Sequence, residues 1–326
     1  MDNCRKISVD IIQNVLKNGG YSNIVLKDKL NQSDLNDLDK SLVTEIVYGT
    51  LRRKYTIDKI IKYFVKNRFD KIDDYILDIL RISIYQIEYL KKVPSFAAVN
   101  EGVELAKRKS LGASKFVNGV LRNFLRNRKA QFFDASDMIE EICYVYSLDR
   151  WMAEFFINQY GIEVSKRIFE GFNEVPDVTV RCNLLKSDVN GIKKYLTDEG
   201  YTVEEPYMSK NALRIEKGKS IEKNVLYKKG FITVQDESAM TAVECMDLKD
   251  NLKVMDLCSA PGGKATYISE IMNNTGCVNS FDIYKNKISL INKNAKRLEI
   301  TNIKAEIMDA SEFNENFANC FDRVLA

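Results

Sequence analysis

The sequence contains no histidine among its 326 residues. Catalytic triads that depend on an imidazole and metal sites built from histidine are therefore excluded, so a general base must be Asp, Glu, Lys, Tyr or water. The seven cysteines occur singly and form no Cys-x-x-Cys pair. This pattern argues against a disulfide framework and against a zinc cluster. We expect no bound metal.

Long uninterrupted apolar runs are also missing. Residues 1–16 form an amphipathic pattern that charged residues interrupt, which fits neither a signal peptide nor a membrane span. We therefore expect a cytoplasmic protein with no membrane partner. We also expect a monomer. A chain of this length with 45% hydrophobic residues predicts two or three domains with proper cores.

The most informative segment is the apolar run that leads into a loop of small residues. A short buried strand is predicted over 252–257 and a helix over 265–272. Between them, Gly262 and Gly263 allow positive φ and let a ligand lie against N–H groups at the helix start. The spacing fits neither a phosphate-binding P-loop nor the three-glycine dinucleotide fingerprint.

Two carboxylates follow at the ends of predicted strands. The strand over 277–281 leads into Asp282, and the strand over 303–308 leads into Asp309, with a helical pattern between them. This alternation predicts a doubly wound α/β sheet. An acidic residue at the end of the second strand can bind ribose hydroxyls, although such a residue is about as often a helix cap.

Nine residues of this region carry a resemblance to a known family. They are the loop residues Cys258, Ser259, Ala260, Pro261, Gly262, Gly263 and Lys264 and the strand-end residues Asp282 and Asp309. They resemble the S-adenosylmethionine site of RNA (cytosine-5) methyltransferases of the Sun (RsmB) type. The resemblance implies that the loop surrounds the methionine part of the cofactor, that Asp282 holds the ribose, and that Asp309 lies near the adenine.

One stretch between residues 107 and 129 is basic and contains no acidic residue. Its basic residues are Lys107, Arg108, Lys109, Lys115, Arg122, Arg126, Arg128 and Lys129. Unrelieved positive charge favours a polyanion such as RNA, and the alternative is a solvated helix face.

The pattern along the chain predicts a multidomain protein. Residues 1–130 contain helical patterns, and the segments 96–101 and 115–122 resemble the RNA-binding domain of the antitermination factor NusB, which Sun-type enzymes carry at the N-terminus. A helical connector over 131–174 follows. Residues 175–236 show the strand and helix order of a ferredoxin-like domain, which contacts RNA in this family. Residues 237–326 form the first part of an incomplete Rossmann-like methyltransferase domain.

The resemblance implies methylation of C5 of a cytosine in small-subunit (16S) ribosomal RNA through a covalent Cys–cytosine intermediate. In the family, Asp-x-Pro-Cys and Thr-Cys motifs follow the strand that corresponds to residues 321–326. We therefore expect a C-terminally truncated chain that is itself inactive, with its nucleophilic cysteine beyond Ala326. Cys258 is a poor substitute, because a thiol beside the sulfonium would face the wrong side of the methyl group.

Two other classes of protein stay open as alternatives. A truncated RNA-binding protein without catalysis would bind RNA but no cofactor, and the glycine loop argues against it. A methyltransferase acting on a small molecule or a protein would not need the basic helical domain, and the basic stretch argues against that class.

Overall fold

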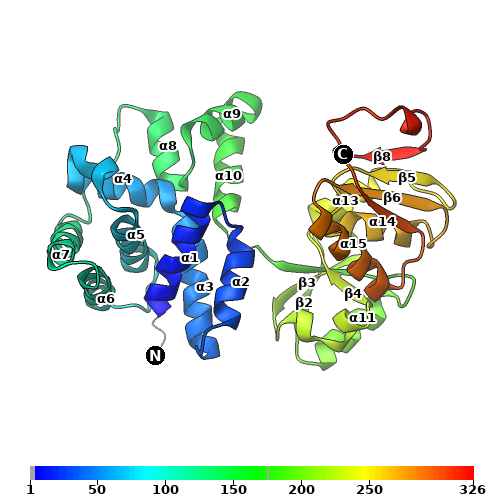
Figure 1. Cartoon of the computed structure of the whole chain (residues 1–326), viewed down its shortest axis with the longest axis horizontal. Helices are drawn as coiled ribbons and strands as arrows, with labels where there is room; N and C mark the ends of the chain where they lie inside the picture. Colours follow the sequence, from blue (N-terminus) through cyan, green and yellow to red (C-terminus); the bar gives the residue numbers. More distant parts are fainter. Residues whose placement is uncertain (1–3, 175) are drawn as a thin grey trace. The chain divides into compact units, whose positions relative to one another are not determined.

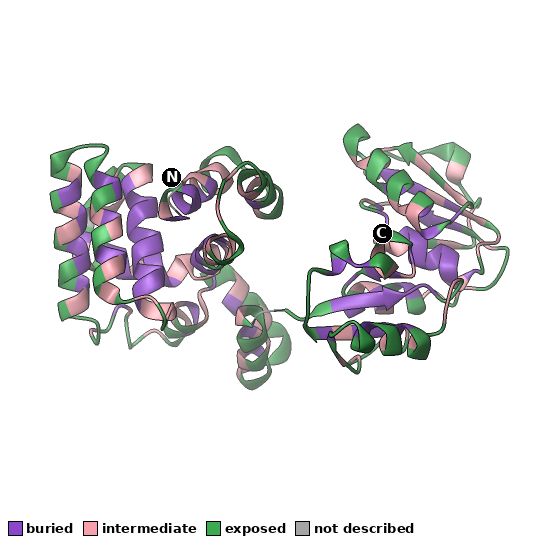
Figure 2. Ribbon diagram, turned by 90° about the horizontal axis from the view of Figure 1, so that it is seen from below, coloured by how far each residue is buried: buried purple, intermediate pink, exposed green. Residues whose placement is uncertain are grey.

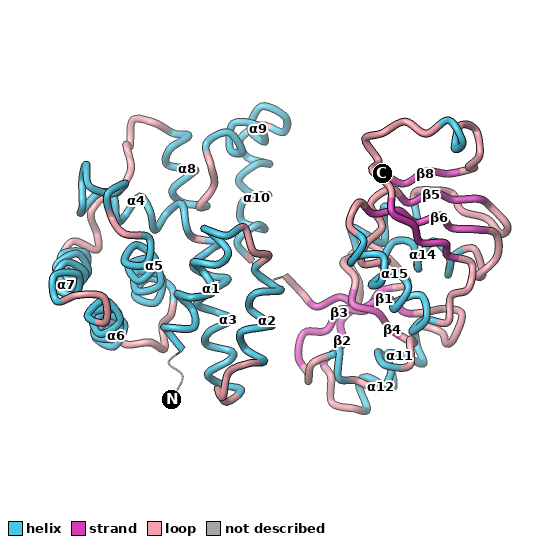
Figure 3. The backbone as a smooth tube through the Cα atoms, in the orientation of Figure 1, coloured by secondary structure: helices cyan, strands magenta, loops and turns pink. Residues whose placement is uncertain are grey.

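The chain splits into two compact units, Met1–Glu174 and Val175–Ala326, of which the computed structural model describes residues 4–174 and 176–326. The described part of the first unit is helical, and the strands belong to the second unit (Figures 1 and 3). Buried residues gather inside each unit, and exposed ones lie on the outer helix faces (Figure 2). In these described ranges, no helix combines the length and the apolar character that crossing a membrane requires.

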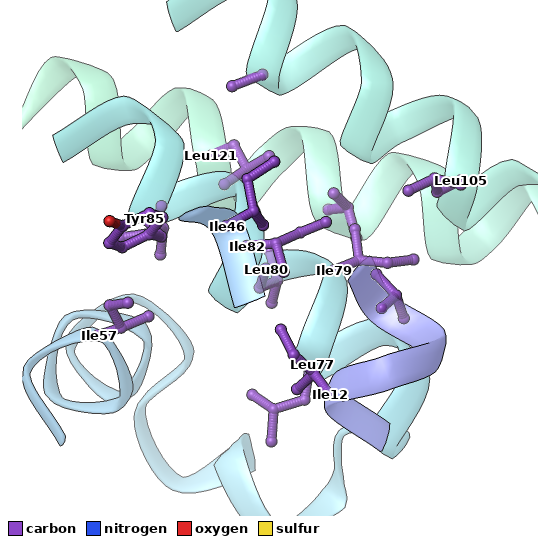
Figure 4. Packing of buried hydrophobic residues seen from close by; sticks show 14 of the residues in the cluster. Ile12, Ile46, Ile57, Leu77, Ile79, Leu80, Ile82, Tyr85, Leu105 and Leu121 are labelled. Atoms are coloured by element: carbon purple, nitrogen blue, oxygen red, sulfur yellow. The ribbon is translucent and has the colours of Figure 1, made fainter. Parts of the chain in front are cut away.

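The first unit is a bundle of helices around α5 (Asp74–Tyr89). The other helices are α1 (Cys4–Asn18), α2 (Ser22–Asn31), α3 (Asp37–Arg52), α4 (Lys54–Val65), α6 (Ser95–Lys107) and α7 (Leu111–Arg126), with a 3₁₀ segment η1 (Lys66–Lys71). Twelve of the 16 residues of α5 are buried, so this helix belongs in the centre of the bundle. Its Leu80 and Ile82 share one cluster with Ile46 and Leu121 (Figure 4).

A charged network lies inside this bundle. The Arg81 guanidinium donates to both carboxylate oxygens of Asp58, at 2.7 and 2.9 Å, and to Asp78 at 2.8 Å. Burial raises the pKa of Asp78 to about 6, although the positive charge of Arg81 acts in the opposite direction. The network therefore satisfies Arg81 while Asp78 carries the cost of desolvation.

The described part of the first unit ends with α8 (Met138–Tyr146), α9 (Arg150–Tyr160) and α10 (Ile162–Asn173). The sequence pattern predicts one helical segment over 150–172. The structure divides this segment at Gly161, which takes a φ of 74° that no α-helix accommodates.

The second unit begins with an antiparallel sheet of strand order β2-β3-β1-β4. Its strands are β1 (Val178–Cys182), β2 (Thr202–Glu204), β3 (Ala212–Lys217) and β4 (Ile232–Val234), and its helical segments are α11 (Val189–Asp198), η2 (Ile221–Lys223) and α12 (Val225–Lys228). The predicted order of strands and helices is confirmed. The sequence pattern also predicts one helical segment over 220–226. This prediction is wrong, because the extended backbone of Asn224 separates η2 from α12, and the Asn224 side chain accepts a bond from Leu226 N.

A parallel sheet of order β7-β6-β5-β8 follows. Its strands are β5 (Lys253–Asp256), β6 (Cys277–Asp282), β7 (Ile303–Ile307) and β8 (Arg323–Leu325), and the helical segments are α13 (Glu237–Glu244), α14 (Gly263–Ile271), α15 (Lys285–Leu298) and η3 (Glu315–Phe317). Val254 and Val278 pack with α13 and α14 in one cluster. The strand predictions in this region hold to within two residues at each end.

A buried ion pair joins the antiparallel sheet to the helix α14. Arg181 on β1 donates to Glu270 on α14 at 2.8 Å, and their side chains are 0% and 2% exposed. Arg181 also donates to Thr266 Oγ1 at 3.0 Å, to the carbonyl of Gly263 at 2.7 Å and to Gln235 Oε1. The ferredoxin-like sheet thus holds the start of α14, where the glycine loop ends.

Candidate cofactor site

The glycine loop connects β5 to α14, and its shape depends on Gly262. This residue caps α14 with φ 98° and ψ 13°, a conformation that side chains rarely adopt. A Cβ at this position would also lie 3.1 Å from the Cα of Ile291 on α15. Glycine is therefore required both for the backbone conformation and for the packing of α15.

Gly263 behaves differently from its neighbour. It is the first residue of α14, so its backbone is helical and the expectation of positive φ at this position is wrong. A Cβ there would meet the amide of Gln235 at 3.6 Å, an ordinary van der Waals distance. Its carbonyl accepts the bond from Arg181 described above.

Contacts from two neighbouring elements fix the rest of the loop. Ser259 N donates to the carbonyl of Phe281 on β6 at 2.9 Å, and Gly262 N donates to the carbonyl of Ser259 at 2.7 Å. Asn294 on α15 donates its side-chain amide to the carbonyl of Pro261 at 2.8 Å. Cys258 is exposed. The loop is thus held by β6 on one side and by α15 on the other.

Asp256, at the carboxyl end of β5, is the most unusual group of the site. It is fully buried, and neither carboxylate oxygen has a hydrogen-bond partner in the described chain. The hydroxyls of Ser259 and Ser280 are also buried without a partner. Burial raises the pKa of Asp256, whereas the nearby Ser259 hydroxyl and Lys264 ammonium lower it.

Such a carboxylate is costly unless something pairs with it. A positively charged ligand beside the glycine loop would offset the negative charge of Asp256, as the Lys264 ammonium does. Asp256 was not among the predicted site residues because it stands at the end of an apolar run. Its signal in the sequence is a carboxyl group placed at the last position of a buried strand, directly before a glycine loop.

Asp282 lies on the neighbouring strand, close enough for its charge to act on the pKa of Asp256. Its Oδ1 accepts a bond from Tyr284 N at 3.1 Å and lies 3.8 Å from Lys287 Nζ. The side chain is nearly buried, and it does not cap the first turn of α15, whose N-cap residue is Tyr284. The strand end thus directs this carboxylate into the same edge of the sheet as Asp256.

Asp309 stands two residues after β7, and its side chain is half-buried. Its Oδ1 accepts bonds from the Ser311 backbone N–H at 2.9 Å and the Ser311 hydroxyl at 2.7 Å. These bonds hold the pKa of Asp309 below its usual value. Both bonds stabilise the turn after the strand and keep the carboxylate ionised.

The basic residues between 107 and 129 lie at the end of α6, along α7 and just after it. Acidic residues from outside the stretch neutralise some of them: Arg128 pairs with Glu88 at 2.7 Å and Lys109 pairs with Asp73. No ion pair is recorded for Lys115 or Arg126 in the described part of this unit. The stretch therefore contains no acidic residue in sequence, but acidic residues from other parts of the first unit neutralise some of its positive charge.

Comparison with known proteins gives three family matches. The model of the NusB family matches residues 2–126. The ferredoxin-like domain of RsmF/B-like methyltransferases matches residues 148–222. The 16S rRNA methyltransferase RsmB/F family matches residues 243–326. The predicted combination of a NusB-like helical domain, a ferredoxin-like domain and a methyltransferase domain is confirmed.

Individual relatives agree with these matches. A probable ribosomal RNA small subunit methyltransferase B from Bacillus subtilis (strain 168) is 36% identical over 323 residues, which are 98% of this chain and 72% of that protein. A protein of the same description from Synechocystis sp. is 29% identical over 93% of this chain and 69% of its own length. These comparisons do not bear out the expected C-terminal truncation.

Solved structures show the same fold. The crystal structure of PH0851 superposes with a TM-score of 0.75 at 21% identity, covering 96% of this chain and 71% of that one. A methyltransferase homolog from Pyrococcus horikoshii gives a TM-score of 0.51 at 23% identity, over 59% of this chain and 62% of its own. Because the chain is 36% identical to the Bacillus relative and covers 72% of it, it belongs to the ribosomal RNA small subunit methyltransferase B family.

Proposed function

We propose that this protein transfers a methyl group from S-adenosylmethionine to C5 of a cytosine in small-subunit (16S) ribosomal RNA. Family membership supports the reaction class and the kind of RNA. The observation that most supports cofactor binding is the position of Asp256. This fully buried carboxylate lies beside the glycine loop and has no hydrogen-bond partner in the described chain.

The residues around the loop suit S-adenosylmethionine by charge. This cofactor carries an ammonium and a sulfonium, and bound here it would supply an electrophilic methyl group. Asp256 would pair with the positive charge of the methionine part, and the loop from Cys258 to Lys264 would surround that part. Asp282 would accept hydrogen bonds from the ribose hydroxyls, and Asp309 would lie near the adenine.

The base needs separate activation. C5 of cytosine is a poor nucleophile until a thiolate adds at C6, and loss of the C5 proton later expels the thiolate. The proposal includes this covalent Cys–cytosine intermediate but assigns none of the described cysteines to it. Cys258 belongs to the cofactor loop, where its thiol would lie beside the sulfonium and would face the wrong side of the methyl group to reach C6 of the base.

A test in the source organism addresses the RNA product. Disruption of the gene is expected to remove one 5-methylcytosine from the small-subunit RNA, as seen by bisulfite sequencing. An unchanged methylation pattern would refute the proposed reaction. Re-expression of this chain in the disrupted strain tests the prediction that the chain does not turn over by itself, because an inactive chain leaves the cytosine unmethylated. A cytoplasmic location and a monomeric state likewise stay predictions.

Calorimetry with S-adenosylmethionine separates the proposal from its main alternative. A methyltransferase is expected to bind the cofactor, and Asp256→Asn should weaken the binding. A protein that binds ribosomal RNA but shows no heat of cofactor binding would instead be an RNA-binding protein without catalysis.

A further inference from the structure

A groove of about 690 Å³ opens on the second unit, apart from the glycine loop. Three segments that are distant in sequence form it: the loop after β1, the turn between α12 and β4, and the last two turns of α15. It is lined by Lys186, Lys228, Lys229, Phe231, Lys293, Lys296, Arg297 and Glu299.

The lining is strongly basic, with six cationic side chains and one carboxylate. That carboxylate, Glu299, pairs with Lys186 at 2.8 Å. Four of these lysines are exposed and form no ion pair with any described residue: Lys228, Lys229, Lys293 and Lys296. Clustered cations without counter-charges repel one another, and a polyanion relieves this repulsion.

The walls of the groove are firmly held. Arg297 donates to the carbonyls of Tyr227 and Ile232 at 2.8 and 3.0 Å, and Lys186 donates to the carbonyl of Lys229 at 2.7 Å. Gly230 takes a φ of 73°, and a Cβ there would meet the Arg297 carbonyl oxygen at 2.1 Å. The lysines are thus displayed on a fixed framework, which lowers the entropic cost of binding a ligand.

An aromatic ring lies among these cations. Phe231 is half-buried in the lining, with Lys186 Nζ 5.6 Å from its ring centroid. Basic side chains combined with an aromatic ring are typical of surfaces that bind RNA strands.

The groove is connected with the cofactor site through α15. Ile291 of this helix packs against Gly262, and Asn294 binds the Pro261 carbonyl, whereas Lys293 and Lys296 point into the groove. An RNA strand held here would therefore lie on the helix that supports the cofactor loop.

We propose that this groove binds the phosphate backbone of the substrate RNA and holds it against the last turns of α15. The inference rests on the proposed function and adds a contact surface outside the basic stretch at 107–129. Since the lysines contact phosphates and not base edges, binding here is expected to depend on salt and little on sequence.

The test replaces the four exposed groove lysines with glutamine in the full chain: Lys228→Gln, Lys229→Gln, Lys293→Gln and Lys296→Gln. The probe is a fluorescent fragment of 16S ribosomal RNA, and its affinity is measured by anisotropy over a range of KCl concentrations. Each lost phosphate contact lowers the log-log salt slope by about 0.7, so the quadruple variant should lose up to about 3 from the slope. Calorimetry should show unchanged affinity for S-adenosylmethionine.

A matched control carries the same change of charge elsewhere on the second unit: Lys210→Gln, Lys217→Gln, Lys219→Gln and Lys304→Gln, all at exposed positions. This control is expected to keep most of the slope. An equal loss of salt slope in both quadruple variants would show that only net charge matters, and would overturn the proposal that the groove binds RNA.

Failure of the groove can be told apart from failure of the proposed function. RNA binding by the unmodified protein with an unchanged slope in the groove variant would overturn the groove alone. No RNA binding by the unmodified protein would overturn both. Binding of poly-glutamate as tightly as RNA, with the same loss in the groove variant, would assign the groove to an acidic protein partner and overturn the RNA proposal.

Discussion

Replacing Arg181 by methionine should loosen the start of α14 and with it the glycine loop. The change removes the ion-pair partner of Glu270 and leaves a carboxylate that is 2% exposed, on which only the more distant charge of Arg297 acts among the described residues. Removing one partner of a buried ion pair costs about 3–5 kcal/mol. The lost bond to the Gly263 carbonyl adds about 1 kcal/mol.

The double variant Arg181→Met with Glu270→Met is the informative comparison. Apolar residues of similar size often replace a buried pair without loss, so the double variant should recover most of the stability. The bond from Arg181 to the Gly263 carbonyl stays lost, and Thr266 Oγ1 remains as a donor to this carbonyl at 3.0 Å, so the deficit should not exceed about 1 kcal/mol. With the second single variant, Glu270→Met, these changes form a double-mutant cycle whose coupling energy should exceed about 2 kcal/mol.

The pH gives an independent check on the single variant. Burial already raises the pKa of Glu270, and Arg181 opposes this shift. Without the arginine the pKa rises further, so the carboxyl group is protonated in the folded variant at acidic pH. A carboxyl group whose pKa is higher in the folded than in the unfolded state stabilises the fold at low pH, and this stabilisation is lost as pH increases. The loss caused by Arg181→Met should therefore grow between pH 5 and pH 8.

The measurement must report on the second unit. The single tryptophan, Trp151, belongs to the first unit, so its fluorescence is unsuitable. Hydrogen exchange of peptides covering residues 253–271 gives the opening free energy of β5 and α14 directly. A single variant that loses less than about 1 kcal/mol, or a double variant as unstable as the single one, would refute the role given to this ion pair.

Three further predictions concern other groups. Gly262→Ala should weaken S-adenosylmethionine binding and destabilise the second unit by about 1–3 kcal/mol, because Gly262 has a positive φ and packs closely against α15. The matched change Gly263→Ala should be tolerated, and calorimetry and hydrogen exchange distinguish the two variants. Asp256→Asn and Asp282→Ala should each lower cofactor affinity by about 1–3 kcal/mol in calorimetry, and equal affinity in both variants and the unmodified protein would contradict the assignment. Burial raises the pKa of Asp78 to about 6, so the stability tied to this group is lost as pH rises from about 4 to 6; Asp78→Asn should remove about 2–3 kcal/mol of this pH dependence in denaturant titrations, and parallel curves for variant and unmodified protein would count against it.

The sequence predicted the elements well where local pattern decides the structure. The strand before the glycine loop, the helix after it and the two strand-end carboxylates all follow from apolar periodicity and glycine placement. Gly161 is a different case, because an apolar pattern can continue across a residue whose φ ends the helix. Sequence periodicity alone could not show this break.

Features made by distant segments could not be predicted. Glu270 lies within a predicted helix, and its burial depends on Arg181, 89 residues away. The groove lysines stand at 186, 228–229 and 293–296, so no run of charge marks them in the sequence. Conversely, Arg128 belongs to an unbroken basic stretch, yet Glu88 on another helix neutralises it.

The contact between Arg181 and α14 has a consequence for protein engineering. Separate family models cover the ferredoxin-like and methyltransferase segments, as if each were an exchangeable module. The Arg181 guanidinium of the ferredoxin-like segment is nevertheless enclosed by Gln235, Thr266 and Glu270. A graft that changed only one segment would therefore leave a buried charge without its partner. Chimeras should therefore inherit Arg181 and Glu270 from the same parent, and the useful place to cut the chain is the boundary between the two compact units, near residue 174.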